Sequence, residues 1–244
     1  MKEKIYTIPI NDAVDAGAFC PFCLMYKRLE ESAVSYAVGP AMMEPDFRQL
    51  TNEKGFCKKH MQQLHAESKA LALALVLDTH LERVSGTLET DLKREKKGII
   101  KKGSASKAEF VKLLEKVNSS CVICDNIEDT FARYFDTFLF MLKKDRDFWG
   151  KVLETEGFCM EHFSRLISLA AKEYSDSDFE KKILPVIDLQ KRRIKEYNTH
   201  IKNFVKNFDY RNVNNKTDVP NEILLKTGQL LNGEFQPQEK KLNI

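Results

Sequence analysis

All six cysteines of this chain belong to one motif that occurs twice. Each copy has the pattern C-x2-C, then 31 or 32 residues, then G-F-C-x2-H, and corresponding positions of the two copies are 101 or 102 residues apart. The eight Cys and His residues of the two copies are, in chain order, Cys20, Cys23, Cys57, His60, Cys121, Cys124, Cys159 and His162. A repeat of about 100 residues is too long for a solenoid unit and indicates two homologous subdomains.

Three cysteines and one histidine are a common ligand set for structural zinc, which binds four ligands in a tetrahedron. A catalytic zinc ion normally keeps one position for water, whereas each copy here fills all four. The pattern therefore predicts two structural Zn²⁺ ions per chain. An iron–sulfur cluster with three Cys and one His ligand is the minority alternative.

The spacing also bears on which ligands share an ion. Cys23 and Cys57 are 34 residues apart, whereas Cys23 and Cys159 are 136 apart. A loop four times longer costs roughly 1.2 kcal/mol more to close. We therefore expect each ion to bind the four ligands of one copy. The alternative combines the C-x2-C pair of one copy with the C-x2-H pair of the other.

The composition favours helices. Gly (10 residues) and Pro (7) are scarce in 244 residues, and 31% of the residues are charged, a balance that suits long helices better than a turn-rich β fold. The predicted fold is all-α, with two duplicated helical subdomains, each stapled by a Cys3His metal site, a long C-terminal helix and a polar tail. The corresponding ranges are residues 1–97 for the first repeat, 98–107 for a basic linker, 108–208 for the second repeat and 209–244 for a poorly packed, partly mobile tail.

Hydrophobic periodicity places most ligands where helices begin. The predicted helices are residues 20–38, 45–53, 57–97, 106–117, 121–143, 146–155, 159–173 and 177–208, with a short one at 221–231. The leucine stripe at 64–92 is predicted to be core, or else the seam of a homo-oligomer. His65, His80 and His200 lie outside the motif and are expected to be surface or half-buried residues.

Two other chemistries deserve comparison with zinc binding. Cys20-Pro-Phe-Cys23 looks like a glutaredoxin-type redox motif, but such a motif follows a strand, and no strand pattern precedes it here. The basic linker and Lys191-Arg192-Arg193 could contact nucleic acid, although the net charge of the chain is only +3. Charge runs of this kind are usually solvated.

Catalytic signatures are missing from the sequence. Phosphate-binding glycine loops and the G-x-S-x-G nucleophile motif do not occur, and Glu30-Glu31 is predicted to lie on a helix surface without a partner histidine. The N-terminus has no apolar stretch of signal-peptide length, and the longest strongly apolar run has 8 residues, far below the roughly 20 of a membrane-spanning helix. We expect a cytoplasmic protein that is not an enzyme and has no membrane partner.

Beyond the ligands, the first copy resembles a bacterial family from Firmicutes, domain-of-unknown-function 6062. The segments that carry the resemblance are Ile5-Tyr-Thr-Ile-Pro9, Cys20-Pro-Phe-Cys23, Gly39-Pro40, Met43-Glu-Pro-Asp-Phe-Arg48, Thr51-Asn-Glu-Lys-Gly-Phe-Cys57 and His60. The resemblance covers about residues 1–208 with both copies of the motif. It implies a cytosolic helical protein with tandem sites and adds no reaction.

These observations predict a zinc-binding helical protein that acts as a non-enzymatic interaction or adaptor module with a protein partner. A thiol-based redox sensor or redox-regulated chaperone is the first alternative, because oxidation of the thiolates would eject zinc. A nucleic-acid-binding regulator is the second.

Overall fold

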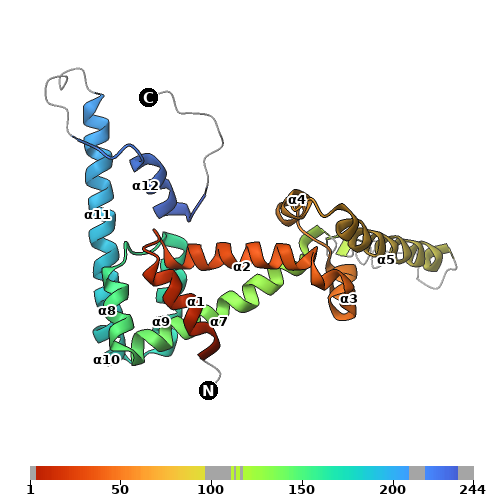
Figure 1. The fold of residues 1–244 in the computed structure, drawn as a ribbon, viewed down its shortest axis with the longest axis horizontal. Coiled ribbons are helices and arrows are strands. Elements are labelled where there is room, and N and C mark those ends of the chain that lie inside the picture. The colour runs from red at the N-terminus through yellow and green to blue at the C-terminus, as the bar shows by residue number, and fades with distance from the viewer. Residues whose placement is uncertain (1–3, 97–110, 113, 116–117, 209–217, 236–244) are drawn as a thin grey trace. The chain divides into compact units, whose positions relative to one another are not determined.

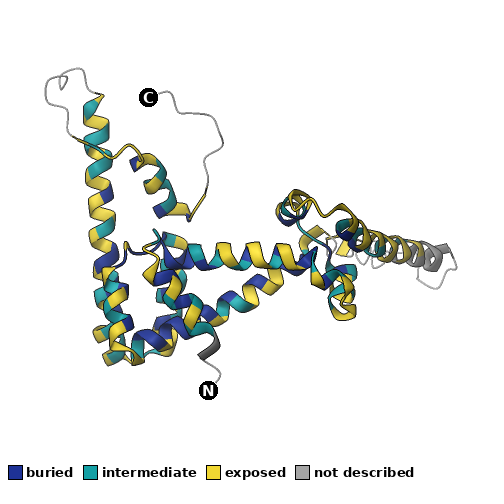
Figure 2. Cartoon of the chain, viewed as in Figure 1, coloured by how far each residue is buried: buried dark blue, intermediate teal, exposed yellow. Residues whose placement is uncertain are grey.

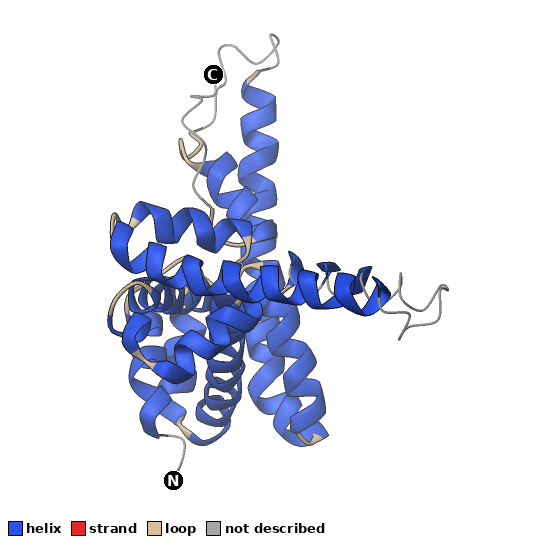
Figure 3. Ribbon diagram, turned by 90° about the vertical axis from the view of Figure 1, so that its right-hand side faces the viewer, coloured by secondary structure: helices blue, strands red, loops and turns tan. Residues whose placement is uncertain are grey.

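The described part of the chain is helical throughout. The computed structural model describes residues 4–96, 111–112, 114–115, 118–208 and 218–235, and within these ranges it contains helices and loops and no strand (Figure 3). The all-α prediction is therefore confirmed. The predicted linker, 98–107, and most of the predicted helix at 106–117 lie outside the described residues. No helix in the described ranges has the length and apolar character needed to cross a membrane.

The chain forms two compact units, and neither follows the order of the sequence copies. Unit 1 contains residues 1–27 and 131–244, and unit 2 contains residues 28–130. This division differs from the predicted one, in which residues 1–97 and 108–208 each form a subdomain. Both boundaries between the units fall inside helices, α2 (Pro21–Ala37) and α7 (Val122–Lys144). Each unit therefore contains parts of both copies.

Unit 1 is built around a cluster of aromatic side chains. It shares α2 and α7 with unit 2 and contains the first residues of α2 and most of α7. Its other elements are α1 (Lys4–Asp15), α8 (Arg146–Glu154), α9 (Met160–Glu173), α10 (Asp176–Asp178), the π-helical turn η2 (Phe179–Ile183), α11 (Leu184–Asn207) and α12 (Ile223–Asn232) (Figure 1). Six phenylalanines are fully buried: Phe22, Phe131, Phe135, Phe138, Phe148 and Phe158. The ring of Phe22 stacks on Phe135 with centroids 4.0 Å apart.

Unit 2 has a smaller, aliphatic core. It comprises the rest of α2 and the start of α7, with η1 (Pro40–Met43), α3 (Pro45–Lys54), α4 (Lys58–Ala66) and α5 (Ala70–Lys96). Its buried apolar side chains include Val34, Leu64, Val76, Ile123 and Ile127, and none of its described aromatic residues is buried. Burial of apolar area is the main stabilising contribution in a domain, so unit 2 has the weaker core (Figure 2).

The helix boundaries agree with most of the predicted ones to within two residues, with three exceptions. The helix predicted at 177–208 is divided into α10, the π-helical turn η2 and α11. The predicted helix at 57–97 is two helices, α4 and α5, because Ser68 has φ 56°, a left-handed conformation that ends a right-handed helix. Helix α1 was not predicted, and it contains Pro9.

The leucine stripe on α5 is largely outside the core, so the first of the two predicted roles is wrong, and the homo-oligomer seam stays a prediction. Helix α5 buries Ala72 and Val76, whereas Leu71, Leu75 and Leu81 are exposed. These leucines are next to the buried positions in the sequence and therefore lie on another face of the helix.

The C-terminal segment is better packed than predicted. The helix expected at 221–231 is present as α12, and its Ile223 and Leu230 are 2% and 4% exposed. They pack with Tyr197 of α11 in a small apolar cluster. Residues 209–217 and 236–244 of the predicted polar tail lie outside the described residues.

Candidate metal centres

The structure brings all eight predicted ligand residues into two groups, but the expected pairing within each copy is wrong. Site 1 consists of Cys20, Cys23, Cys159 and His162, and site 2 consists of Cys57, His60, Cys121 and Cys124. Each site therefore combines the C-x2-C pair of one copy with the C-x2-H pair of the other. Each also lies wholly within one compact unit, site 1 in unit 1 and site 2 in unit 2.

The helices that follow each C-x2-C pair differ in length. An α-helix rises about 1.5 Å per residue, so the 17 residues of α2 extend about 25 Å. The following helix α3 has 10 residues and extends only about 15 Å. The same difference occurs between α7, with 23 residues, and α8, with 9. A loop-closure difference of about 1.2 kcal/mol is small beside the packing of such rigid helices, so it does not specify the pairing.

In site 1, the Nδ1 atom of His162 faces three sulfur atoms. It lies 3.6 Å from Cys20 Sγ, 3.4 Å from Cys23 Sγ and 3.2 Å from Cys159 Sγ. The sulfur atoms of Cys23 and Cys159 are 3.7 Å apart. All four residues are buried, so the group is enclosed by protein.

Site 2 has nearly the same geometry with a different exposure. His60 Nδ1 lies 3.3 Å from the sulfur atoms of Cys57, Cys121 and Cys124, and the Cys57 and Cys124 sulfurs are 3.8 Å apart. His60 and Cys121 are buried, whereas Cys57 is partly exposed and Cys124 is exposed. Site 2 can therefore be reached from solvent on its thiolate side.

These spacings fit one tetrahedral metal ion per site. With Zn–S bonds of about 2.3 Å and Zn–N bonds of about 2.0–2.1 Å, a tetrahedron separates its sulfurs by about 3.8 Å and sulfur from nitrogen by about 3.6 Å. In each site the four ligand atoms lie within 4.8 Å of one another. The donor set and the geometry both suit an ion that prefers thiolate and imidazole ligands.

The local backbone presents the ligands at helix starts. Cys57 and Cys159 are the N-cap residues of α4 and α9, so each histidine three positions later lies on the same side of the first turn. The glycine before each Phe-Cys has positive φ, +63° for Gly55 and +99° for Gly157. A Cβ at Gly55 would come within 2.5 Å of His80 Nε2, and one at Gly157 within 2.9 Å of Gln190 Oε1. The Gly-Phe-Cys part of the motif is thus explained by backbone geometry and close packing.

Gln190 of α11 fixes this backbone turn at site 1. Its side chain is 1% exposed, accepts a hydrogen bond from Phe158 N at 3.0 Å and donates one to Phe158 O at 2.8 Å. At site 2, His80 Nδ1 lies 3.0 Å from the carbonyl oxygen of Asn52. His80 is half-buried and is not a ligand, as predicted, and it supports the backbone before the turn. No sequence motif marks either residue, because both lie more than 20 residues from the turn they support.

We expect Gly157→Ala to destabilise the protein by about 1–3 kcal/mol, because it forces a left-handed backbone onto alanine and crowds Gln190. Gly150→Ala in α8 is the matched control, since a Cβ there meets nothing within 4 Å. It should be neutral or stabilise by about 0.5–1 kcal/mol. Denaturant unfolding of the metal-loaded proteins measures both, and equal effects would contradict this account of Gly157.

The two histidines have different surroundings on the side away from the thiols. His60 Nε2 lies 3.2 Å from the Glu30 carboxylate, which also contacts Lys59 Nζ at 2.6 Å and Gln63 Nε2 at 3.0 Å. A carboxylate in this position fixes the tautomer and orientation of a metal-binding histidine. Glu30 was expected to lie on a helix surface without a histidine partner, and that prediction is wrong. His162 instead packs among phenylalanine rings, with Phe131 at 5.3 Å between centroids.

The surroundings of the thiols shift their pKa values in opposite directions within each site. Burial raises the pKa of Cys20, and the hydrogen bond with Cys159 is the main cause that raises the pKa of Cys23 to about 12. The pKa of Cys159 is lowered because the thiols of Cys20 and Cys23 donate to it. A cation that binds all three sulfurs must displace the remaining protons, which makes metal binding pH-dependent.

Site 2 follows the same rule. Burial and the neighbouring Cys121 thiol raise the pKa of Cys124 to about 12. Burial also acts to raise the pKa of Cys57, but the backbone N–H of His60 and the thiols of Cys124 and Cys121 outweigh it, so the pKa is lowered. In both sites the cysteine whose pKa is lowered is a helix N-cap residue, where the helix dipole favours negative charge.

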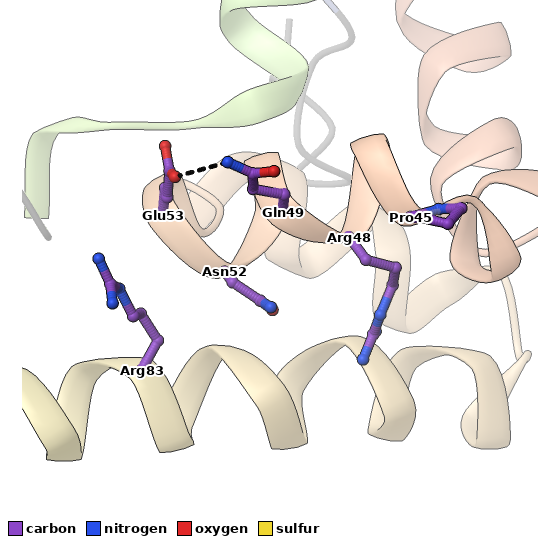
Figure 4. Close-up of a pocket in the computed structure, with 6 residues that line it drawn as sticks. All are labelled: Pro45, Arg48, Gln49, Asn52, Glu53 and Arg83. Atoms are coloured by element: carbon purple, nitrogen blue, oxygen red, sulfur yellow. Dashed lines mark hydrogen bonds between the residues drawn. The ribbon is translucent and has the colours of Figure 1, made fainter.

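A polar hollow in unit 2 is separate from the ligands. It has a volume of about 480 Å³ and lies between α3 and α5 (Figure 4). Its lining residues are Pro45, Arg48, Gln49, Asn52, Glu53 and Arg83. Arg48 Nη2 donates to Thr79 Oγ1, and Thr79 donates to Asn52, both at 2.6 Å. This network links α3 to α5, and the lining of the hollow contains neither a cysteine nor a histidine.

The fold and the two groups of ligands define an all-α protein with two Cys3His sites. The chain belongs to the family of unknown function DUF6062, whose model matches residues 1–238. Searches of the curated proteins and of the solved structures found no match. The family match extends past residue 208 and includes α12.

Proposed function

We propose that this protein binds two structural Zn²⁺ ions and acts as a non-enzymatic interaction module. The observation that carries the proposal is the meeting of eight ligand atoms in two groups with tetrahedral spacing. Each group supplies four protein ligands, so a bound ion would have no position for water or substrate. Such a site holds helices together rather than performing chemistry.

Zinc is favoured over an iron–sulfur cluster by the short distances between ligands. The four ligands of a cluster are divided among two or four iron atoms, which requires more room than one ion does. Here the sulfur pairs are 3.7 and 3.8 Å apart. All six cysteines are free thiols rather than disulfides, which suits a reducing compartment such as the cytoplasm.

An interaction role is supported by apolar side chains that unit 2 leaves exposed. Leu71 and Leu81 of α5 are 74% and 65% exposed. Exposed apolar surface on a helix is typical of contact with another protein. The structure gives less support to the nucleic-acid alternative. Lys191 and Arg193 lie 3.3 and 3.1 Å from Asp188 and Glu196, so their charges are already paired with acidic side chains.

Redox sensing remains the second candidate, and one observation favours it. Cys124 is an exposed thiol with Cys57 Sγ at 3.8 Å, so an oxidant could reach it. Peroxide-dependent zinc release followed by a change in oligomeric state would move this function to first place.

Elemental analysis tests the metal part of the proposal. Protein purified under reducing, metal-replete conditions should contain about two zinc ions per chain, four ligands to each ion. Iron with acid-labile sulfide would indicate a cluster instead. A content of one metal ion or none would refute two sites of this kind.

A further inference from the structure

The C-terminal helix α12 reaches across site 1. Its buried residues Ile223 and Leu230 pack on Tyr197 of α11, together with the partly buried Phe19, which immediately precedes Cys20. The helix ends at Gly233, whose φ of +84° turns the chain away from the helix axis. This anchoring fixes where the next backbone groups lie.

The residues that follow this turn lie directly against the thiols. Glu234 N donates to Cys23 Sγ at 3.4 Å, and the Glu234 carboxylate lies 3.9 Å from Lys27 Nζ. A Cβ placed on Gly233 would lie 3.9 Å from the sulfur atoms of both Cys23 and Cys159. The segment Ile223–Glu234 therefore covers the thiolate side of site 1, and we call it the C-terminal clasp.

The consequence of the clasp is visible in the exposure of the sulfur ligands. Cys20, Cys159 and Cys23 are 1%, 0% and 7% exposed. An N–H group that donates to a metal-bound thiolate also takes part of its negative charge and disfavours its protonation. Both effects oppose the departure of the ion.

Site 2 differs on the same side of the ligand group. Cys124 is exposed and Cys57 is partly exposed, although the distances between ligand atoms match those of site 1. A chelator or a competing thiol removes an ion by binding it before the protein ligands leave, so access to the thiolates limits the rate. The two sites thus share a donor set and differ in access.

We infer that site 2 is the exchangeable site for a soft divalent cation, and that the C-terminal clasp makes site 1 a slow, closed site. The inference rests on the proposed zinc function and adds an order of release. Unit 2 would respond to metal availability or to thiol reagents while unit 1 keeps its ion.

The experiment uses full-length protein loaded with two Zn²⁺ ions and mixed with an excess of a chromogenic chelator. Release should be biphasic, with one ion per chain in each phase and rates that differ by at least about tenfold, as expected when one site must open locally before exchange. Cys159→Ser, which disrupts site 1, should leave only the fast phase. Cys121→Ser, which disrupts site 2, should leave only the slow phase.

The role of the clasp is tested in the Cys121→Ser background. Leu230→Ala weakens the anchor of α12 and should accelerate the slow phase by about tenfold or more, because it favours local opening. Leu231→Ala is the matched control, since this neighbour is 57% exposed and its removal should leave the rate unchanged. Circular dichroism and zinc content before mixing establish that each variant is folded and loaded.

Equal release rates from the two sites, or a faster site 1, would overturn the inference. A slow site 1 that Leu230→Ala does not accelerate would overturn the role of the clasp. In all these cases the wild-type protein still binds two zinc ions before mixing, and the Cys121→Ser variants bind one, so the proposed function stands. Failure of the proposed function is distinguishable, because the protein would then contain no zinc to release.

Discussion

Two double substitutions, each of which removes one C-x2-C ligand and one C-x2-H ligand, should leave different numbers of zinc ions bound. Cys23→Ser with Cys159→Ser removes two ligands of site 1 and should leave about one zinc ion per chain. Cys23→Ser with Cys57→Ser removes one ligand from each site and should leave about none. The reason is that each site takes one pair from each copy of the motif.

Elemental analysis after exhaustive dialysis against a weak chelator makes this measurement. Both variants lose two cysteines and share Cys23→Ser, so each controls for the number of thiols in the other. Closure within each copy would reverse the outcome, since Cys23 and Cys57 would then share an ion. That reversed result would refute the exchange between the copies.

Removal of both ions is expected to lower the melting temperature by roughly 10–20 °C. Structural zinc contributes on the order of 10 kcal/mol per site in small peptides, and even about 5 kcal/mol corresponds to this shift at about 2–4 °C per kcal/mol. Buried phenylalanines hold much of unit 1 together without the ion, so loosening rather than complete unfolding should follow. Unit 2, with its aliphatic core, should lose more protection from hydrogen exchange.

Differential scanning calorimetry with and without a strong chelator measures the shift, and hydrogen exchange locates it. The control is Cys57→Ser with Cys159→Ser, which disrupts both sites and should respond little to chelator. If the wild-type protein melts at one temperature in both states, the sites are not structural. A redox or regulatory role would then be the better explanation.

Much of the fold class was determined by the sequence alone. Scarce glycine and proline with apolar residues at helical spacing predicted helices such as α2, α7 and α9, because helix formation depends on local periodicity and capping. The eight ligand residues were also evident, since metal chemistry requires particular side chains at short local spacings, C-x2-C and C-x2-H. Each of those spacings is set within one turn of a helix.

The partners of those local pairs were decided by the tertiary structure. A difference of about 1.2 kcal/mol in loop closure cannot specify a pairing when the helices between the pairs are rigid and unequal in length. The 17-residue α2 and the 10-residue α3 lie between Cys20 and Cys57 in the chain, and the turn after each helix helps to decide which pairs meet. The buried face of α5 was also beyond sequence-based prediction, because Ala72 rather than Leu71 faces the core.

The supporting residues also belong to the tertiary structure. Glu30 beside His60, Gln190 beside Phe158 and Glu234 beside Cys23 are 30, 32 and 211 residues from their partners. Sequence spacing carries no information on such contacts, because they arise when separate helices pack. The sequence thus determined which side chains are candidate metal ligands and which helices present them. Packing alone decided which ligands meet, and it placed the C-terminal clasp over one of two otherwise similar sites.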